Sequence, residues 1–548
     1  MPALKYVPLG GLGEVGLNMW ALEWENDLVV IDAGLMFGQD EMPGVDLVLP
    51  DPSYLLQAGR KVHGIFLSHG HEDHIGGLPF LLKRLNVPVF GTPLTLGLAK
   101  SRLREHRILR ESDLREVRLG DRVRLGPFSI ETVAVSHSIP DAAALIIETP
   151  IGRLLYTSDF KLEADPPYGR ATDLERFRRL GEQGVLLMLS DSTNAEREGH
   201  SGSERDLVPE FERIFTEAPG RIVVASFASN IHRIQLAVRL AAEHGRRVAV
   251  AGRSLRNAFQ VARELGHLEV PENLTVKLEK AGDDPRLVLL TAGSQGEPLS
   301  ALARFAAQKH PVVNVRSGDW VILSARPIPG NERLVNRTIN NLYRNGAERV
   351  FYSEVGHVHV SGHAYRDELR QLIELVRPRF FVPVHGEYRQ LHHHAELAVA
   401  TGIPKERVFL AEDGNVIEVT PEGLKKTAEN VSGLVYVDGL GIGDVGQAVL
   451  RDRQHLAADG LVVATVGVDR DTGAIRLGPE VTSRGFIASG PEADLQEEAT
   501  RAVAAAVARA GRRPDRSLLQ EAVHDAVSQL LWKKTGRRPM VVPLVTEV

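Results

Sequence analysis

One pattern recurs through the first two hundred residues and once more far downstream: a short apolar run stops at a His or an Asp beside small residues. Runs of this length that are rich in Val, Ile and Leu are typical of buried strands. The predicted strands, each with the polar residue that follows it, are 28–31 before Asp32, 64–68 before His69, 132–136 before His137, 154–158 before Asp159, 185–190 before Asp191 and 380–384 before His385. Ligands gather outside the C-terminal ends of strands in layered α/β folds, so we expect these polar side chains to share one site.

The pattern changes after residue 202, where amphipathic stretches at 206–215 and 231–243 predict helices. These helices alternate with apolar runs as far as about residue 355, which predicts a separate α/β domain. Because His385 returns to the earlier pattern, we interpret this domain as an insertion into the first one.

The last part of the chain is separated from the rest by a glycine-rich connector at 431–446. Beyond it, the sequence predicts a strand at 461–466, helices at 495–510 and 517–534, and a closing strand at 540–545. The predicted domains are a core in two parts at 1–200 and 356–430, an inserted domain at 201–355, a linker at 431–450 and a C-terminal α/β domain at 451–548.

Length and composition agree with this division. At roughly 150 residues per domain, the 548 residues predict three or four domains. The 65 Lys and Arg against 71 Asp and Glu give a net charge of -6, so the bulk charge does not indicate a nucleic-acid binder. The absence of Cys excludes thiol nucleophiles and cysteine-type zinc sites. No apolar stretch reaches the roughly 18 residues of a membrane span, so we expect a cytoplasmic protein without a membrane partner.

The densest chemistry lies in Ser68-His69-Gly70-His71-Glu72-Asp73-His74-Ile75-Gly76-Gly77, between a predicted strand and a predicted helix. Imidazoles and carboxylates at this density suit zinc, and the same donors accept manganese or iron. The segment therefore predicts a metal site. By contrast, His392-His393-His394 falls in a predicted helix, where adjacent residues point in different directions, and we interpret it as a solvated helix start.

The motif His-x-His-x-Asp-His followed by Gly-Gly resembles that of the metallo-β-lactamase superfamily. The resemblance implies a four-layer αββα sandwich that binds two divalent metal ions, Zn or Mn. It assigns His69, His71 and His137 to one ion and Asp73, His74 and His385 to the other, with Asp159 between them and Asp32 orienting a ligand.

Three further motifs resemble the β-CASP branch of that superfamily, which processes nucleic acids. They contain Asp191, His363 and His385. The opening segment 9–16, the segment Gly293-Ser294-Gln295-Gly296-Glu297-Pro298 and the additional C-terminal module are similar to the bacterial ribonuclease J family. The resemblance covers most of the chain and weakens after about residue 451.

The resemblance gives His363, Asp73 and Asp191 catalytic roles, with His363 stabilising the transition state or protonating the leaving group. The residues that it places at the substrate are His359, Val360, Ser361, Gly362 and His363, and two polar residues of another loop, Ser229 and Asn230, are added as candidate contacts. A structural calcium ion is a further hypothesis, with Asp438 and the 43–46 loop as its ligands.

The leading hypothesis is a metal-dependent ribonuclease that acts 5'-to-3' on single-stranded RNA with a 5'-monophosphate and also cuts internally, in RNA maturation and decay. The family resemblance implies a homodimer or homotetramer formed through the C-terminal domain, and proteins of an RNA-decay complex as partners. The alternatives are a DNA nuclease or 3'-end-processing endonuclease, a small-molecule hydrolase such as a lactamase or thioesterase, and a noncatalytic RNA-binding subunit. The last two leave the inserted domain or the complete ligand set unexplained.

Overall fold

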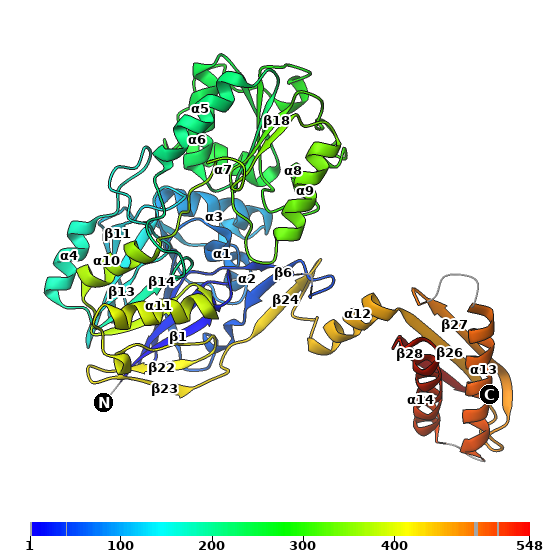
Figure 1. The fold of residues 1–548 in the computed structure, drawn as a ribbon. Helices are drawn as coiled ribbons and strands as arrows, with labels where there is room; N and C mark the ends of the chain where they lie inside the picture. Colours follow the sequence, from blue (N-terminus) through cyan, green and yellow to red (C-terminus); the bar gives the residue numbers. More distant parts are fainter. Residues whose placement is uncertain (1–2, 40, 487–491, 512–514) are drawn as a thin grey trace. The chain divides into compact units, whose positions relative to one another are not determined.

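The structure is a computed structural model that describes residues 3–39, 41–486, 492–511 and 515–548 (Figure 1). The chain forms two compact units. The first contains the chain up to Met36 together with Leu49–Val435, and the second contains Phe37–Val48 and Tyr436–Val548.

Two sheets form the centre of the first unit. The eight-stranded sheet has the order β23 (Leu424–Ala428), β22 (Val416–Val419), β1 (Leu4–Gly10), β3 (Met19–Trp24), β4 (Asp27–Ile31), β7 (Lys61–Phe66), β8 (Val89–Gly91) and β9 (Leu114–Glu116). The six-stranded sheet has the order β10 (Arg122–Leu125), β11 (Phe128–Ala134), β12 (Ala143–Thr149), β13 (Gly152–Tyr156), β14 (Leu187–Asp191) and β20 (Phe380–Val384). In the second sheet β13, β14 and β20 are parallel, so their C-terminal ends share one edge.

The buried side chains define four layers. One core lies between the two sheets and includes Tyr6, Trp20, Leu145 and Phe380. A second core packs α2 (Leu78–Leu82) and α3 (Pro93–Glu105) on the first sheet. A third packs α4 (Leu174–Gln183), α10 (Arg366–Val376) and α11 (Tyr388–Ala400) on the other sheet. The αββα sandwich is thereby confirmed, and its strands read as continuous apolar runs because both faces are covered.

The inserted segment forms a sheet of its own in which every pairing is parallel. Its order is β16 (Arg247–Ala251), β17 (Leu287–Thr291), β15 (Ile222–Ala225), β18 (Trp320–Leu323) and β19 (Arg349–Phe351). Helices α5 (Val208–Glu217), α6 (Ile231–Glu243) and α7 (Arg253–Glu264) contribute to one core, and α8 (Ala301–Ala306) and α9 (Glu332–Arg344) to another. A parallel sheet with helices over both faces is the arrangement that alternating strands and helices predict.

The second unit contains a three-stranded sheet in the order β27 (Ile475–Arg484), β26 (Leu461–Val468) and β28 (Met540–Glu547). Helices α13 (Glu492–Ala510) and α14 (Arg516–Thr535) complete its core with the sheet. Helix α12 (Gln447–Asp459) precedes this module and buries only Leu450 among its residues. Among the helices described here, none is both long enough and apolar enough to cross a membrane.

Candidate metal centre and active site

The backbone turns sharply where three of the core strands end. Asp32 follows β4, Ser158 follows β13 and His385 follows β20, and they have φ values of 59°, 53° and 56°. This left-handed conformation is uncommon for residues other than glycine and clusters at functional sites. The turns gather the side chains that follow the strands at one edge of the sandwich.

The first group of donor atoms comes from His69, His71, His137 and Asp159, whose ligand atoms lie within 4.8 Å of one another. The Nδ1 atom of His71 is 3.0 Å from His69 Nε2 and 3.1 Å from His137 Nε2. Asp159 Oδ2 lies 3.5 Å from His69 Nε2 and 3.7 Å from His137 Nε2. The donor atoms therefore face one another, as ligands of a single metal ion do.

The second group contains Asp73, His74, Asp159 and His385. Asp159 Oδ2 lies 3.3 Å from His74 Nε2, and Asp159 Oδ1 lies 3.6 Å from His385 Nε2. Asp73 Oδ2 is 3.4 Å from His385 Nε2 and 3.5 Å from His74 Nε2. Asp159 thus belongs to both groups, the position that a carboxylate between two ions would need.

A third group, which the sequence did not predict as such, contains Asp159, Asp191, His363 and His385. His363 Nδ1 lies 2.8 Å from Asp191 Oδ2, and His385 Nδ1 lies 3.3 Å from Asp191 Oδ1. Thr193 donates its hydroxyl to Asp191 Oδ1 at 2.7 Å and lies equally close to His385 Nδ1. Asp191 therefore orients both histidines.

The protonation states of the first group favour metal binding. Burial lowers the pKa of His69 and His137 well below the ordinary range, and burial lowers the pKa of His71 to about 4. The neutral imidazole is the form that coordinates a metal ion. Metal binding would therefore release no protons from these histidines at neutral pH.

In the second group the ionised forms are favoured, whereas the histidines of the first group are neutral. Burial opposes ionisation of Asp159 and Asp73, yet His385 and His74 beside them hold the pKa of both carboxyls below the ordinary range. Burial disfavours charge on His74, but the Asp159 carboxylate and its acidic neighbours raise the pKa of His74 to about 10. Asp159 Oδ1 is buried and has no hydrogen-bond partner among the described residues. Two neighbouring carboxylates, one of them with a buried and unpartnered oxygen, fit a divalent cation.

Two residues outside the donor groups hold the ligands in place. Asp32 accepts hydrogen bonds from Ser68 N at 2.7 Å and Tyr156 OH at 3.1 Å, and its Oδ2 lies 2.8 Å from His74 Nδ1. Asn18, which the sequence analysis missed, donates through Nδ2 to Asp73 Oδ2 at 3.3 Å. No motif surrounds Asn18, and only the folded chain brings it to the site.

The predicted substrate loop lies against the first donor group. His137 Nδ1 donates to Gly362 O at 2.7 Å, which leaves Nε2 free to coordinate. A Cβ atom at Gly362 would lie 3.0 Å from the His137 ring, so glycine permits this close approach. Ser361 Oγ accepts from Asn194 Nδ2 at 2.9 Å, which fixes the middle of the loop. Burial lowers the pKa of His359 to about 3, and this histidine is therefore neutral.

Ser229 and Asn230, the two further candidate contacts for the substrate, lie in the turn that precedes α6. Asn230 is 1% exposed, and its side chain accepts a hydrogen bond from Arg233 N at 3.0 Å. This contact caps the N-terminus of α6.

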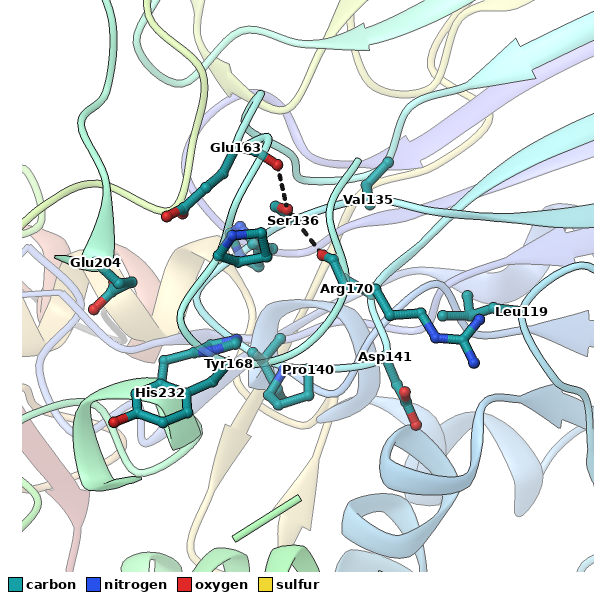
Figure 2. Close-up of a pocket in the computed structure, with 14 residues that line it drawn as sticks. Leu119, Val135, Ser136, Pro140, Asp141, Glu163, Tyr168, Arg170, Glu204 and His232 are labelled. Carbon is teal, nitrogen blue, oxygen red and sulfur yellow. Dashed lines mark hydrogen bonds between the residues drawn. The ribbon is translucent and has the colours of Figure 1, made fainter. Parts of the chain in front are cut away.

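A small cavity lies beside the centre and shares only His137 with the three donor groups (Figure 2). Ser136 Oγ donates to Arg170 O at 3.0 Å on one side of the cavity. His232 also lines it, and burial lowers the pKa of His232 to about 4. The carboxylates that line the cavity are paired with cationic or imidazole groups, Glu163 with Lys161, Glu204 with Arg233 and Asp141 with His267.

An arginine side chain contacts the groups that were predicted to bind calcium. Arg453 forms an ion pair with Asp438 Oδ2 at 2.5 Å and donates to Pro43 O at 3.0 Å. The guanidinium thereby binds the carboxylate and the loop carbonyl that the hypothesis gave to calcium.

Models of four protein families match the chain. They are "Metallo-beta-lactamase superfamily" over residues 12–225, "Ribonuclease J, beta-CASP domain" over 219–342, "Zn-dependent metallo-hydrolase RNA specificity domain" over 352–410 and "Ribonuclease J C-terminal domain" over 448–548. A crystal structure of a protein of unknown function from Enterococcus faecalis V583 is also similar, with a TM-score of 0.54 and 20% identity over 76% of this chain and all of that one. That likeness concerns the fold alone.

Relatives of similar length support the same family. Ribonuclease J2 of Bacillus subtilis (strain 168) is 38% identical over 100% of this chain and 99% of its own length. Ribonuclease J of Thermus thermophilus is 41% identical over 99% of this chain and 95% of its own. The chain therefore belongs to the ribonuclease J family of the metallo-β-lactamase superfamily and is a metal-dependent ribonuclease that hydrolyses phosphodiester bonds.

Proposed function

We propose that this ribonuclease degrades single-stranded RNA from a 5'-monophosphorylated end in the 5'-to-3' direction and also cuts internally, in RNA maturation and decay. The observation that carries the proposal is the hydrogen bond from His137 Nδ1 to Gly362 O at 2.7 Å. It ties a loop rich in hydroxyl, imidazole and glycine N–H groups to a metal ligand. A phosphate held by that loop would lie beside the donor groups.

The proposed ligand sets follow the first two donor groups. One ion would be held by His69, His71 and His137 and the other by Asp73, His74 and His385, with Asp159 shared by both. Zn and Mn both suit imidazole with carboxylate, and we propose one of them as the resident metal. Two such ions would polarise the phosphoryl group and make water a stronger nucleophile near neutral pH.

His363 is the proposed proton donor or stabiliser of the transition state. Asp191 accepts from its Nδ1, so the other ring nitrogen, Nε2, is left to face the substrate. Asp191 also favours the protonated imidazole, which can give its proton to the departing 3'-oxygen. His359, Val360, Ser361 and Gly362 would contact the phosphate from the same loop. Ser229 and Asn230 are the weaker substrate proposal, since the Asn230 side chain already caps α6.

The test uses one RNA sequence, labelled at its 3' end, with a 5'-monophosphate, a 5'-triphosphate or a 5'-hydroxyl, incubated with Mn or Zn. The proposal expects mononucleotides from the monophosphate and slower release from the other two, together with internal fragments. Asp73→Ala is the inactive control. DNA of the same sequence separates a ribonuclease from a DNA nuclease. Absence of mononucleotides would overturn the exonuclease proposal, and absence of internal fragments would overturn the endonuclease proposal.

We also propose that the C-terminal domain, predicted at 451–548, joins subunits into a homodimer or homotetramer, and that the chain works in the cytoplasm with proteins of an RNA-decay complex. Support for association comes from two apolar side chains of α14, Leu518 and Trp532, which are 66% and 49% exposed. Light scattering on the full chain and on Leu518→Glu tests this proposal. A monomeric full chain would contradict it.

A further inference from the structure

Two arginines converge on the hydroxyl of Tyr365, two residues after His363. Arg326 Nη1 donates to Tyr365 OH at 2.9 Å, and Arg197 Nη1 lies 3.5 Å from the same oxygen. The guanidinium carbon of Arg197 is also 5.8 Å from the centre of the Tyr365 ring. Arg326 and Tyr365 are partly exposed and Arg197 is exposed, so solvent and ligands can reach this cluster.

The cluster has no acidic partner within the part of the chain that the structure describes. The two acids beside Arg197 in the sequence are engaged elsewhere, since Glu196 pairs with Arg389 and Glu198 pairs with Arg366. Neither Arg197 nor Arg326 forms an ion pair with any described residue. Two neighbouring guanidinium groups without counter-charges attract an anion, and their planar donor arrays match phosphate oxygens.

The cluster is held at a fixed place relative to the substrate loop. Arg366 N donates to Arg197 O at 2.8 Å, which joins the segment of Arg197 to the start of α10. In the same segment, Asn194 forms a β-bridge with Tyr365 and donates to Ser361 Oγ at 2.9 Å. An RNA strand bound at the 359–363 loop would therefore pass close to the two arginines.

Arg326 is positioned by Gln295, a residue of the segment 293–298 that the sequence analysis found similar to the ribonuclease J family. Gln295 is 3% exposed. Its Nε2 donates to Arg326 O at 2.9 Å, and its Oε1 accepts from Ile328 N at 2.7 Å. Both groups of one buried amide thus hold the backbone that carries Arg326.

We propose that Arg326 and Arg197, gathered on Tyr365, bind a backbone phosphate of the RNA adjacent to the phosphodiester that is cut, and that Gln295 is a positioning residue for Arg326. The inference rests on the proposed function, because it assigns a second phosphate-binding position to the same substrate. RNA repeats a phosphate at every nucleotide, so a chain whose scissile phosphate lies at the loop presents the next phosphate nearby.

The experiment compares Arg326→Ala with the matched control Arg286→Ala in the full chain with its metal. Arg286 is exposed and immediately precedes β17, whereas Arg326 follows the C-terminal end of β18, so the two lie at opposite edges of one parallel sheet. For a 5'-monophosphorylated oligonucleotide, Arg326→Ala should raise KM about tenfold and change kcat less. The plot of log KM against log salt should lose about 0.7 of slope, as expected for one phosphate contact on a single strand. Arg286→Ala should leave both unchanged.

Further variants separate charge from position. Arg326→Lys keeps the charge and should keep the salt slope while KM rises, because the planar fork is lost. Gln295→Ala should likewise raise KM and keep the salt slope, because Arg326 remains charged but is held less firmly. Tyr365→Phe removes only the shared hydroxyl and should raise KM by roughly threefold. The melting temperature of each variant controls for folding.

A KM and a salt slope for Arg326→Ala equal to those of Arg286→Ala would overturn the inference. So would a loss in kcat alone, since that would place Arg326 at the chemical step. The wild type distinguishes this failure from failure of the proposed function. If it releases no mononucleotides, the exonuclease proposal falls, and anisotropy with the same labelled RNA still tests Arg326 by the same slope.

Discussion

At the scale of single residues, Asp32 lies outside the three donor groups but orients a histidine that belongs to one of them. Its two oxygens accept from Ser68 N, from Ser68 Oγ and from Tyr156 OH, and one of them lies 2.8 Å from His74 Nδ1. The histidine ring is thereby locked with Nε2 toward Asp159. Outer contacts of this kind set the tautomer and the basicity of a ligand.

Replacing Asp32 by Asn keeps the shape but removes one acceptor, and it should lower metal affinity about 10- to 100-fold. Calorimetric titration of metal-depleted protein with Mn or Zn measures this directly. Asp173→Asn is the control, because Asp173 caps α4 and is not a member of any of the three donor groups. Equal affinities in the two variants would refute the role given to Asp32.

A second residue-scale prediction concerns the half-buried acid pair Asp413 and Glu14. Burial and the charge of Glu14 raise the pKa of Asp413 to about 8, from an ordinary value of 3.8. The folded chain therefore keeps a proton that the unfolded chain releases. The stability that this proton brings is fully present below the ordinary pKa and is lost as the pH rises through about 8. Asp413→Asn should flatten the fall in the free energy of unfolding as the pH is raised through this interval.

Urea denaturation of the wild type and Asp413→Asn, on the acidic and the alkaline side of that pKa, measures the difference. The variant keeps an oxygen to accept from Leu12 N, which Asp413 Oδ1 does at 3.1 Å. An identical loss of stability in both proteins would show that the pair does not titrate as described.

At the scale of elements, the strands that end at site residues were predictable because they are buried on both faces and read as continuous apolar runs. Strand β27 was missed, since Arg476, Glu480 and Arg484 are exposed along it and break the apolar signal.

The interpretation of the three histidines in α11 as a solvated helix start was wrong for His394. This residue is fully buried, and its Nδ1 lies 2.9 Å from Ser192 Oγ. Its partner is about two hundred residues away in the chain, and local pattern carries no information about such a contact.

The cap of α6 gives an element-scale prediction. Asn230→Ala removes the acceptor for Arg233 N and should lower the free energy of unfolding by about 1 kcal/mol. Asn230→Asp keeps an acceptor at the helix N-terminus and should retain most of the stability. Thermal denaturation measures both. A rise in KM for RNA in Asn230→Ala without loss of stability would instead favour the substrate role.

At the scale of the molecule, the centre is assembled from both sides of the inserted domain and lies apart from the cores that hold the fold together. His69 to Asp191 come from the chain before the insertion, and His363 and His385 come from the chain after it. The large apolar cores lie between the layers, and the donor atoms lie where the strands end. Sequence motifs could point to the residues of the first two donor groups, because the structure does bring their side chains together. They could not reveal the cluster on Tyr365, because Arg197, Arg326 and Tyr365 belong to three distant segments without a shared motif.

This separation predicts the response to metal removal. Chelation should abolish cleavage reversibly and lower the melting temperature of the first unit, because an ion that binds only the folded state stabilises it. The cores should persist, so far-ultraviolet circular dichroism should change little. The second unit is an internal control, since no described residue of it belongs to a donor group. In hydrogen exchange, amides of β4, β13 and β20 should exchange faster after chelation, whereas those of β26 and β28 should keep their rates. Equal acceleration in both units would mean that the ions support the whole chain rather than the edge where the strands end.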